Sequence, residues 1–255
     1  MSQLHWVIEG QGPVVMLSHA LGCDLHMWDE VAALLREGHT VLRYDHRGHG
    51  RSPGGSQPFS VEDLADDAAE LIAHVGRGAV HFVGLSMGGM TAQALAQRHA
   101  PWLRSVVVAH AASHYDAAAQ AAWQQRIAAV REQGMAVVAE GALQRWLTPA
   151  FMVAHPERVV QLRATLLQMD PQAYGHACDA VARIALDAGH AQIACPCLVI
   201  AGAFDAATPL ALSQTMAAQI PGAELRCIDS AHIGCVEQPR EFAALLQDFI
   251  QRNMS

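Results

Sequence analysis

Short apolar runs alternate with amphipathic stretches along most of this chain. The runs are continuous rather than alternating in polarity, as expected of parallel strands that are covered on both faces. A further run, Leu4–Glu9, precedes them and ends at Gly10-Gln11-Gly12-Pro13, which predicts an edge strand followed by a turn. The pattern predicts an α/β protein with a mostly parallel sheet and helices on both faces. The predicted core strands are Val14–Ser18, Thr40–Tyr44, Ala79–Val83, Ser105–Ala109, Cys197–Ala201 and Glu224–Ile228.

Helical periodicity is clearest over Val61–Val75, where apolar residues recur every three or four positions. Ser60 and Asp63 are suitable residues to cap the start of this helix. We also predict a helix from Ser86 to about His99 and a last one from Pro239 to Gln251.

The pattern of apolar residues changes between Ser113 and about Gln192, where strand-like runs are absent. Helical patterns replace them over Ala117–Gln133, Met135–Trp146, Glu157–Met169 and Pro171–Ile184. We therefore predict an α/β core formed by residues 1–112 and 193–255, with a helical cap, or lid, of residues 113–192 inserted after the sixth strand. Such an insertion typically covers an active site, so this segment is expected to determine substrate choice.

Composition narrows the classes of function. The 255 residues are 52% hydrophobic and 16% charged, which is typical of a globular protein, and the net charge is −8. An acidic chain without basic clusters argues against nucleic acid or an anionic membrane as partner. No apolar stretch is long enough to span a membrane, and no signal peptide is recognisable, so we expect a cytoplasmic protein. The six cysteines are expected to be reduced and mostly buried, and Cys195-Pro-Cys197 to lead into a strand rather than bind metal.

The strongest chemical signal is Gly84-Leu85-Ser86-Met87-Gly88, which follows a predicted strand and opens a predicted helix. This is the context of the G-x-S-x-G nucleophile elbow of α/β-hydrolases. The sharp turn exposes the serine hydroxyl at the carboxyl end of the sheet, beside a helix N-terminus that favours developing negative charge. We predict that Ser86 is a nucleophile.

A serine nucleophile needs a base and an acid that orients the base. In this fold the chain order is serine, acid, histidine, which Asp205 and His232 satisfy just beyond two predicted strands. His110 and His114 are competing bases that we interpret as pocket-wall or buried residues. Asp229 is a weaker candidate for the acid, because only a tight local turn could bring it to His232.

An oxyanion hole requires two backbone N–H groups aimed at the carbonyl oxygen. We predict those of Met87, directly after the nucleophile, and of Leu21, in the loop that follows the first parallel strand. His19 is expected to support this loop, and the nearby Trp28 to belong to the core. The segment Asp45-His46-Arg47-Gly48-His49 is interpreted as a hydrogen-bonded turn rather than a metal site. No phosphate loop, dinucleotide motif or zinc spacing is present, so neither a cofactor nor a metal is predicted.

Several phrases together resemble the 3-oxoadipate enol-lactonases, which belong to the α/β-hydrolase superfamily. They are SHALGCDLHMWD, YDHRGHGRSP, VHFVGLSMGGM, VIAGAFDAATP and AHIGCVEQP, with RWLTPAF and HPERV in the predicted cap. The resemblance covers nearly the whole chain and implies Ser86 as nucleophile, Asp205 as acid and His232 as base. The chain departs from the family pattern at Ala20 and at Ile233-Gly234-Cys235, and it matches less closely over Asp179–Gly189. These differences bear on the identity of the substrate more than on the reaction chemistry.

The resemblance implies hydrolysis of 3-oxoadipate enol-lactone to 3-oxoadipate in the β-ketoadipate pathway of aromatic catabolism. The partner is then a small lactone or ester, and the sequence allows a homo-oligomer. The substrate carries a carboxylate, for which Arg126, Arg145, Arg163 and Arg183 are candidate ligands. Alternatives are a general carboxylesterase, another lactonase or a perhydrolase with the same triad, and a hydrolase-fold receptor for a small ligand.

Overall fold

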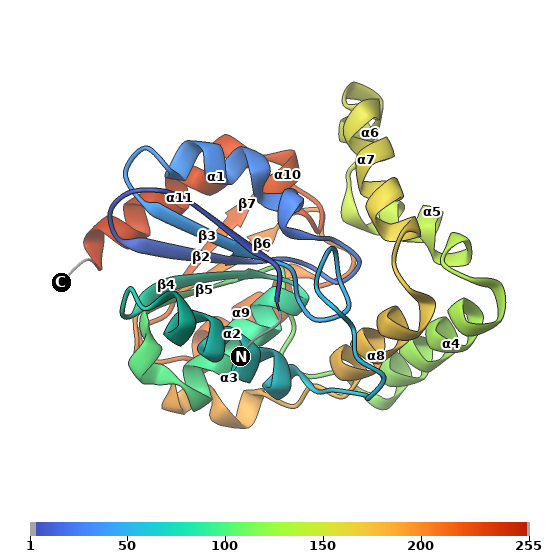
Figure 1. The fold of residues 1–255 in the computed structure, drawn as a ribbon, viewed down its shortest axis with the longest axis horizontal. Coiled ribbons are helices and arrows are strands. Elements are labelled where there is room, and N and C mark those ends of the chain that lie inside the picture. Colours follow the sequence, from blue (N-terminus) through green and yellow to red (C-terminus); the bar gives the residue numbers. More distant parts are fainter. Residues whose placement is uncertain (1–3, 254–255) are drawn as a thin grey trace.

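The computed structural model describes residues 4–253, which form a seven-stranded sheet with helices on both faces (Figure 1). The strand order is β1-β3-β2-β4-β5-β6-β7, and every neighbouring pair is parallel except β1 with β3. The central strands are buried along almost their whole length, as their continuous apolar runs predict. The strands are β1 Trp6–Gly10, β2 Val14–Ser18, β3 Thr40–Tyr44, β4 Val80–Leu85, β5 Leu103–Ala109, β6 Cys197–Gly202 and β7 Glu224–Ile228.

Two groups of helices cover the sheet (Figure 1). One face carries α1 (Asp29–Leu35), α10 (Gly234–Glu237) and α11 (Pro239–Arg252), and the other carries α2 (Val61–Val75), α3 (Met87–Arg98) and α9 (Leu210–Gln219). The predicted boundaries of α2 are confirmed, and Ser60 and Asp63 form a reciprocal capping box at its start. Trp28 is fully buried in the core, as predicted. Short 3-10 helices lie at Leu25–Trp28, Ala100–Trp102 and Asp187–Gln192.

The chain between β5 and β6 is helical and lies to one side of the sheet (Figure 1). The predicted position of this insertion, after the sixth strand, needs a correction: it follows β5, the fifth of the seven strands. The observed strands before the insertion are those expected from the sequence, one edge strand and four parallel strands, so the error lies in their count and not in their identity. The inserted helices are α4 Ala117–Gln133, α5 Ala136–Trp146, α6 Pro149–Ala154, α7 Pro156–Leu167 and α8 Pro171–Ala182.

All six cysteines are free thiols, and four of them are buried. Cys197 is the first residue of β6, in agreement with the prediction for Cys195-Pro-Cys197, and Cys227 is exposed on β7. Within residues 4–253 no helix combines the length and apolar character needed to cross a membrane.

Candidate active site

Ser86 occupies a strained turn between β4 and α3. Its φ of 57° and ψ of −114° lie in a region that L-residues rarely adopt. The turn can be this tight because a Cβ on Gly84 would overlap the carbonyl oxygen of Gly88, and one on Gly88 would overlap that of Ser18. The Ser86 N–H donates to the carbonyl oxygen of Ala109 on β5 at 2.9 Å, which fixes the turn to the sheet.

The structure brings the three predicted triad residues together. His232 Nε2 lies 2.9 Å from Ser86 Oγ, and His232 Nδ1 lies 2.9 Å from Asp205 Oδ2. Asp205 follows β6 and His232 follows β7, so both loops leave the same sheet edge as Ser86. This arrangement can pass the hydroxyl proton to the imidazole while the carboxylate holds the ring in one tautomer.

Asp205 is buried, with 5% of its surface exposed. Burial alone would raise the pKa of its carboxyl, but the hydrogen bonds from His110 and His232 hold that pKa well below its ordinary value. The acid is therefore ionised at neutral pH, as the orienting partner of a catalytic histidine must be.

The alternative candidates for the base and the acid, His110, His114 and Asp229, do not contact Ser86 Oγ in the way that His232 does. His110 is completely buried, in agreement with its interpretation, but its Nδ1 also lies 3.2 Å from Asp205 Oδ2, a contact that the sequence analysis did not predict. His114 is exposed, forms an isolated β-bridge with Ala185 and does not line the cavity over Ser86, so its interpretation as a pocket-wall or buried residue was wrong. Asp229 lines a separate surface groove with Phe151 and Gln238.

The predicted oxyanion-hole residues flank the nucleophile. Met87 is the first residue of α3, so its N–H has no partner four residues earlier within the helix. Leu21 lines the same cavity as Ser86 and His232. His19 braces the Leu21 loop, because its Nδ1 is 2.8 Å from the carbonyl oxygen of Ala20 and its Nε2 accepts the His46 N–H at 2.9 Å.

A cavity of about 440 Å³ opens over Ser86 and His232. Its lining includes four aromatic residues and comes largely from the helical insertion. Burial raises the pKa of the Tyr115 phenol to about 12, so this group is a neutral hydrogen-bond donor at neutral pH. The lining residues from the insertion are Tyr115, Ala119, Ala122, Trp123, Arg126, Arg145, Trp146, Tyr174 and Val181.

Two of the four candidate arginines line this cavity, namely Arg126 and Arg145. The Arg126 guanidinium lies 5.1 Å from the centroid of the Trp123 ring. The other two are ion-paired within the insertion, Arg163 with Glu140 and Arg183 with Asp179. A substrate anion in the cavity would therefore meet Arg126 and Arg145.

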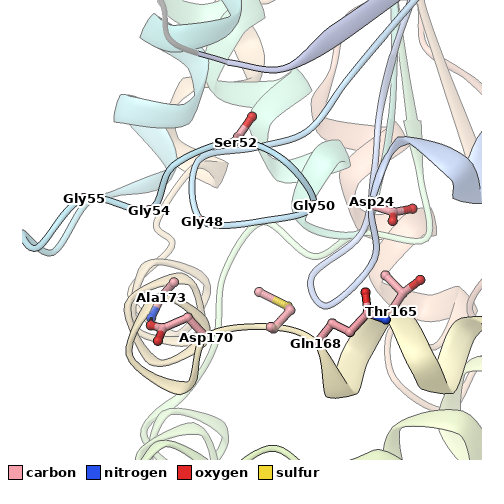
Figure 2. A pocket seen from close by; sticks show the side chains of 11 residues that line it. Asp24, Gly48, Gly50, Ser52, Gly54, Gly55, Thr165, Gln168, Asp170 and Ala173 are labelled. Carbon is pink, nitrogen blue, oxygen red and sulfur yellow. Dashed lines mark hydrogen bonds between the residues drawn. The ribbon is translucent and has the colours of Figure 1, made fainter.

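A second hollow lies between the glycine-rich loop after β3 and the turn that joins α7 to α8 (Figure 2). Asp24, Ser52, Gln168 and Asp170 line it, together with four glycines, and it contains none of the triad residues. The carboxylates of Asp24 and Asp170 cap a 3-10 helix and α8, respectively, so both already have hydrogen-bond donors. We assign no chemistry to this hollow.

Among the described residues, one group of side chains has a geometry that could hold a metal ion. His110, Asp205 and His232 offer ligand atoms that lie within 4.8 Å of one another. The same atoms are hydrogen-bonded to each other, however, and the carboxylate fills the space between the two rings. In the Asp45–His49 turn, Arg47 pairs with Asp67 at 2.6 Å, and Asp45 accepts backbone N–H groups of Leu25 and Arg51, in agreement with a structural role.

Sequence reasoning missed the aromatic lining of the cavity. Helix α4 is rich in alanine and glutamine, and most of it is exposed, so its helical pattern does not reveal an inward face. The available signal was Trp123, the only aromatic residue of that helix.

Comparisons with known proteins agree with this geometry. Residues 13–239 match the family described as alpha/beta hydrolase fold. The chain is 35% identical over 251 residues to 3-oxoadipate enol-lactonase 2 of Acinetobacter baylyi, covering 98% of this chain and 93% of the relative. A proposed carbamate hydrolase of Caulobacter segnis is 30% identical over 254 residues, covering 96% and 94% of the two chains.

The crystal structure of the enol-lactonase from Burkholderia xenovorans LB400 superposes with a TM-score of 0.94 at 33% identity, covering 97% of this chain and 96% of that one. Fold, family model and full-length relatives thus agree. The chain belongs to the α/β-hydrolase family, and over nearly its whole length it is similar to 3-oxoadipate enol-lactonases.

Proposed function

We propose that this protein is a serine hydrolase that opens a small enol-lactone, with 3-oxoadipate enol-lactone as its substrate. The observation that carries this proposal is the hydrogen-bonded series Ser86–His232–Asp205 at the base of a cavity with two arginines. The full-length similarity to enol-lactonases supports the choice of lactone.

In the proposed reaction, Ser86 Oγ attacks the lactone carbonyl while His232 Nε2 takes the hydroxyl proton. The N–H groups of Leu21 and Met87 stabilise the oxyanion of the tetrahedral intermediate. Collapse of this intermediate breaks the ring C–O bond, and the His232 imidazolium gives its proton to the departing enolate oxygen, which leaves more readily than an alkoxide. The opened chain remains attached to Ser86 as an acyl-enzyme.

Water then releases the product. His232 removes a proton from the water, which attacks the acyl carbonyl, and Ser86 leaves with the proton returned by the imidazole. The enol of the product tautomerises to a ketone, which draws the reaction forward. Asp205 keeps its charge throughout and stabilises the imidazolium.

The arginines provide the proposed selectivity. An enol-lactone of this kind carries a free carboxylate, and an arginine in an enclosed site can bind a carboxylate through two parallel hydrogen bonds. Within the described chain neither Arg126 nor Arg145 forms an ion pair with an acidic side chain. We propose that they bind the substrate carboxylate and that residues 113–192 act as the cap that determines which acid enters.

A substrate panel tests this function. Purified protein is assayed with the enol-lactone, simple lactones, p-nitrophenyl esters and a small carbamate, with Ser86→Ala beside it as the control. We expect the enol-lactone to have the highest kcat/KM and Ser86→Ala to lose turnover of every substrate. Equal or faster turnover of neutral esters would contradict the enol-lactone assignment but leave the serine-hydrolase assignment intact. Preference for the carbamate would favour the activity named for the Caulobacter segnis relative.

Unchanged hydrolysis by Ser86→Ala would contradict the nucleophile itself. Ligand binding without turnover by the wild-type protein would favour a receptor of this fold.

A further inference from the structure

The carboxylate of Asp205 accepts more hydrogen bonds than a triad requires. Its Oδ1 accepts the N–H groups of Ala207 and Thr208 at 2.8 and 2.9 Å. Its Oδ2 lies 2.7 Å from Thr208 Oγ1, 2.9 Å from His232 Nδ1 and 3.2 Å from His110 Nδ1. Five donors thus share the approximately four lone pairs of one carboxylate. The imidazole of His110 is the donor that neither the triad nor the local turn explains.

His110 is placed by the strand that separates nucleophile and acid. It follows β5, which lies between β4 and β6 in the sheet. The residue before it, Ala109, accepts the Ser86 N–H, and the His110 N–H donates to Ile200 on β6 at 2.8 Å. The end of β5 therefore contacts the nucleophile through its backbone and the acid through a side chain.

The backbone of His110 is strained, since its φ is 49°, and besides Ser86 it is the only non-glycine residue with positive φ in the described chain. A non-glycine residue keeps such a conformation only where its surroundings hold it there, and such residues cluster at functional sites. Here the strained conformation directs the imidazole toward Asp205.

Two glycines leave the space that the His110 ring fills. A Cβ on Gly234 would lie 2.5 Å from His110 Nε2, and one on Gly202 would lie 3.0 Å from its Cε1. His110 Nε2 is buried and has no hydrogen-bond partner, so the only polar contact of the ring is the one with Asp205.

We propose that His110 is a positioning residue for the hydrolase reaction, which donates its Nδ1–H to Asp205 and thereby holds that carboxylate in line with His232. This role rests on the proposed function of Ser86. The ring is neutral when it does so, because burial lowers the pKa of His110 more than the neighbouring carboxylate raises it. A neutral ring with its proton on Nδ1 donates to Asp205 and leaves Nε2 bare, as observed.

His110 affects the reaction because its hydrogen bond goes to Asp205 Oδ2, the same oxygen that accepts from His232. A third donor on Oδ2 restrains rotation of the carboxylate and draws some of its charge away from His232. Without it, Thr208 remains as a partner, so the triad loosens but does not disassemble. The charged and titratable groups that act on His110 are Asp205, His232 and, at longer range, Glu237.

The experiment uses three variants of the intact protein. His110→Asn keeps a side-chain N–H donor near the position of Nδ1. His110→Ala removes the donor and leaves a cavity. The double variant His110→Ala/Gly234→Ala removes the donor but returns a methyl group to the vacated space. The φ of Gly234 is not in the left-handed region, and the new Cβ requires small shifts of the Ile228 and Ser230 side-chain ends, which lie 2.8 Å from it.

The matched control is His81→Asn. His81 is also buried, with one partner on Nδ1 (Ser105 Oγ at 2.8 Å) and none on Nε2, but it has no contact with the triad. Readouts are Tm, kcat and KM for p-nitrophenyl acetate as functions of pH, and exchange-protected imidazole N–H protons in the downfield proton NMR spectrum.

We expect His110→Ala to lower kcat by about tenfold or more with little change in KM, as for the loss of a hydrogen bond to a charged group. The acidic limb of its kcat–pH profile moves to higher pH, because the less-shared carboxylate holds the proton on the base more strongly. The double variant recovers Tm but not kcat or the pH profile. His110→Asn recovers much of the kcat and of the pH profile. His81→Asn changes Tm alone.

Recovery of kcat by the double variant would overturn the proposal, since it would show that the ring acts only by filling space. An unchanged pH profile in His110→Ala would overturn it as well. If His110→Ala fails to fold, the double variant and His110→Asn decide the question by the same criteria. The NMR readout is independent of substrate: the downfield spectrum of the wild-type protein should contain an imidazole N–H resonance that is lost in His110→Asn and kept in His81→Asn, even if Ser86 proves not to be a nucleophile.

Discussion

The guanidinium of Arg126 lies 5.1 Å from the centre of the Trp123 ring, and both side chains line the cavity above Ser86. Stacking on an aromatic face holds an arginine in place without using its hydrogen-bond donors. Arg126 also interacts with the Tyr174 hydroxyl, and its other donors remain free to bind an anion that enters the cavity.

Replacing this arginine should separate anionic from neutral substrates. We expect Arg126→Gln to raise KM for the carboxylate-bearing lactone by about tenfold to a hundredfold, with KM for p-nitrophenyl acetate nearly unchanged. Steady-state kinetics on both substrates check this, with Arg163→Gln as control because Arg163 is paired with Glu140. Equal losses on both substrates would mean that Arg126 supports the cavity rather than the anion.

Removing the side chain of Ser86 should stabilise the fold while it abolishes activity. Glycine adopts φ near 57° without the strain that any Cβ brings, and such strain costs about 1–3 kcal/mol. Ser86→Gly should therefore have a higher Tm than wild type in thermal denaturation. Ser86→Ala is the matched control, being equally inactive but still strained. A Tm for Ser86→Gly no higher than that of Ser86→Ala would show that the turn stores no relievable strain.

Stability should fall in mild acid because several histidines are buried in neutral form. Burial lowers the pKa of His81 to about 4 from an ordinary 6.5. Between these values the unfolded chain binds a proton that the folded chain does not, so the free energy of unfolding decreases as pH falls, by about 1.4 kcal/mol per pH unit for each such group. Urea unfolding at a series of pH values measures the slope.

In the same experiment His81→Gln should give a shallower slope, whereas His26→Gln, at an exposed site, should leave it unchanged. His49, whose pKa burial lowers to about 3, contributes in the same direction, so the slope persists in part in the His81 variant. A slope unaffected by His81→Gln would contradict the neutral, buried form of that ring.

The capping-box residues of α2 do not line the cavity over Ser86, so replacing them should affect stability alone. Ser60→Ala removes the acceptor for the Asp63 N–H and one partner of the Asp63 carboxylate, which should cost about 1 kcal/mol of unfolding free energy. Chemical denaturation measures this loss, and kcat for p-nitrophenyl acetate should be that of the wild type. A change in kcat would indicate that α2 influences the nucleophile through its packing on α3.

The sequence predicted those parts of the fold that depend on local pattern. The limits of α2 follow from a clean apolar stripe with a cap, and the strands follow from continuous apolar runs. The spatial meeting of Ser86 with His232 could be predicted because parallel strands end at one edge of the sheet. The contact between His110 and Asp205 could not, since it depends on a left-handed residue and on space left by glycines from two other segments.

The helical insertion was predicted as a cap over the active site, but the sequence did not show which of its residues line the cavity. Its arginines have similar sequence surroundings, and only the tertiary structure separates Arg126 and Arg145, which line the cavity, from Arg163 and Arg183, which pair with neighbouring acids.

The insertion also has a consequence for how such a protein can diverge. It closes a loop between Ala109 at the end of β5 and Cys197 at the start of β6, two strands that pair directly. The entropic cost of closing a loop grows only with the logarithm of its length, and doubling the length adds about 0.6 kcal/mol. Helices can therefore be lengthened, exchanged or remodelled here at little expense to folding, while the sheet edge that holds Ser86 stays the same. Selection can act on the shape of the cavity almost independently of the chemistry beneath it.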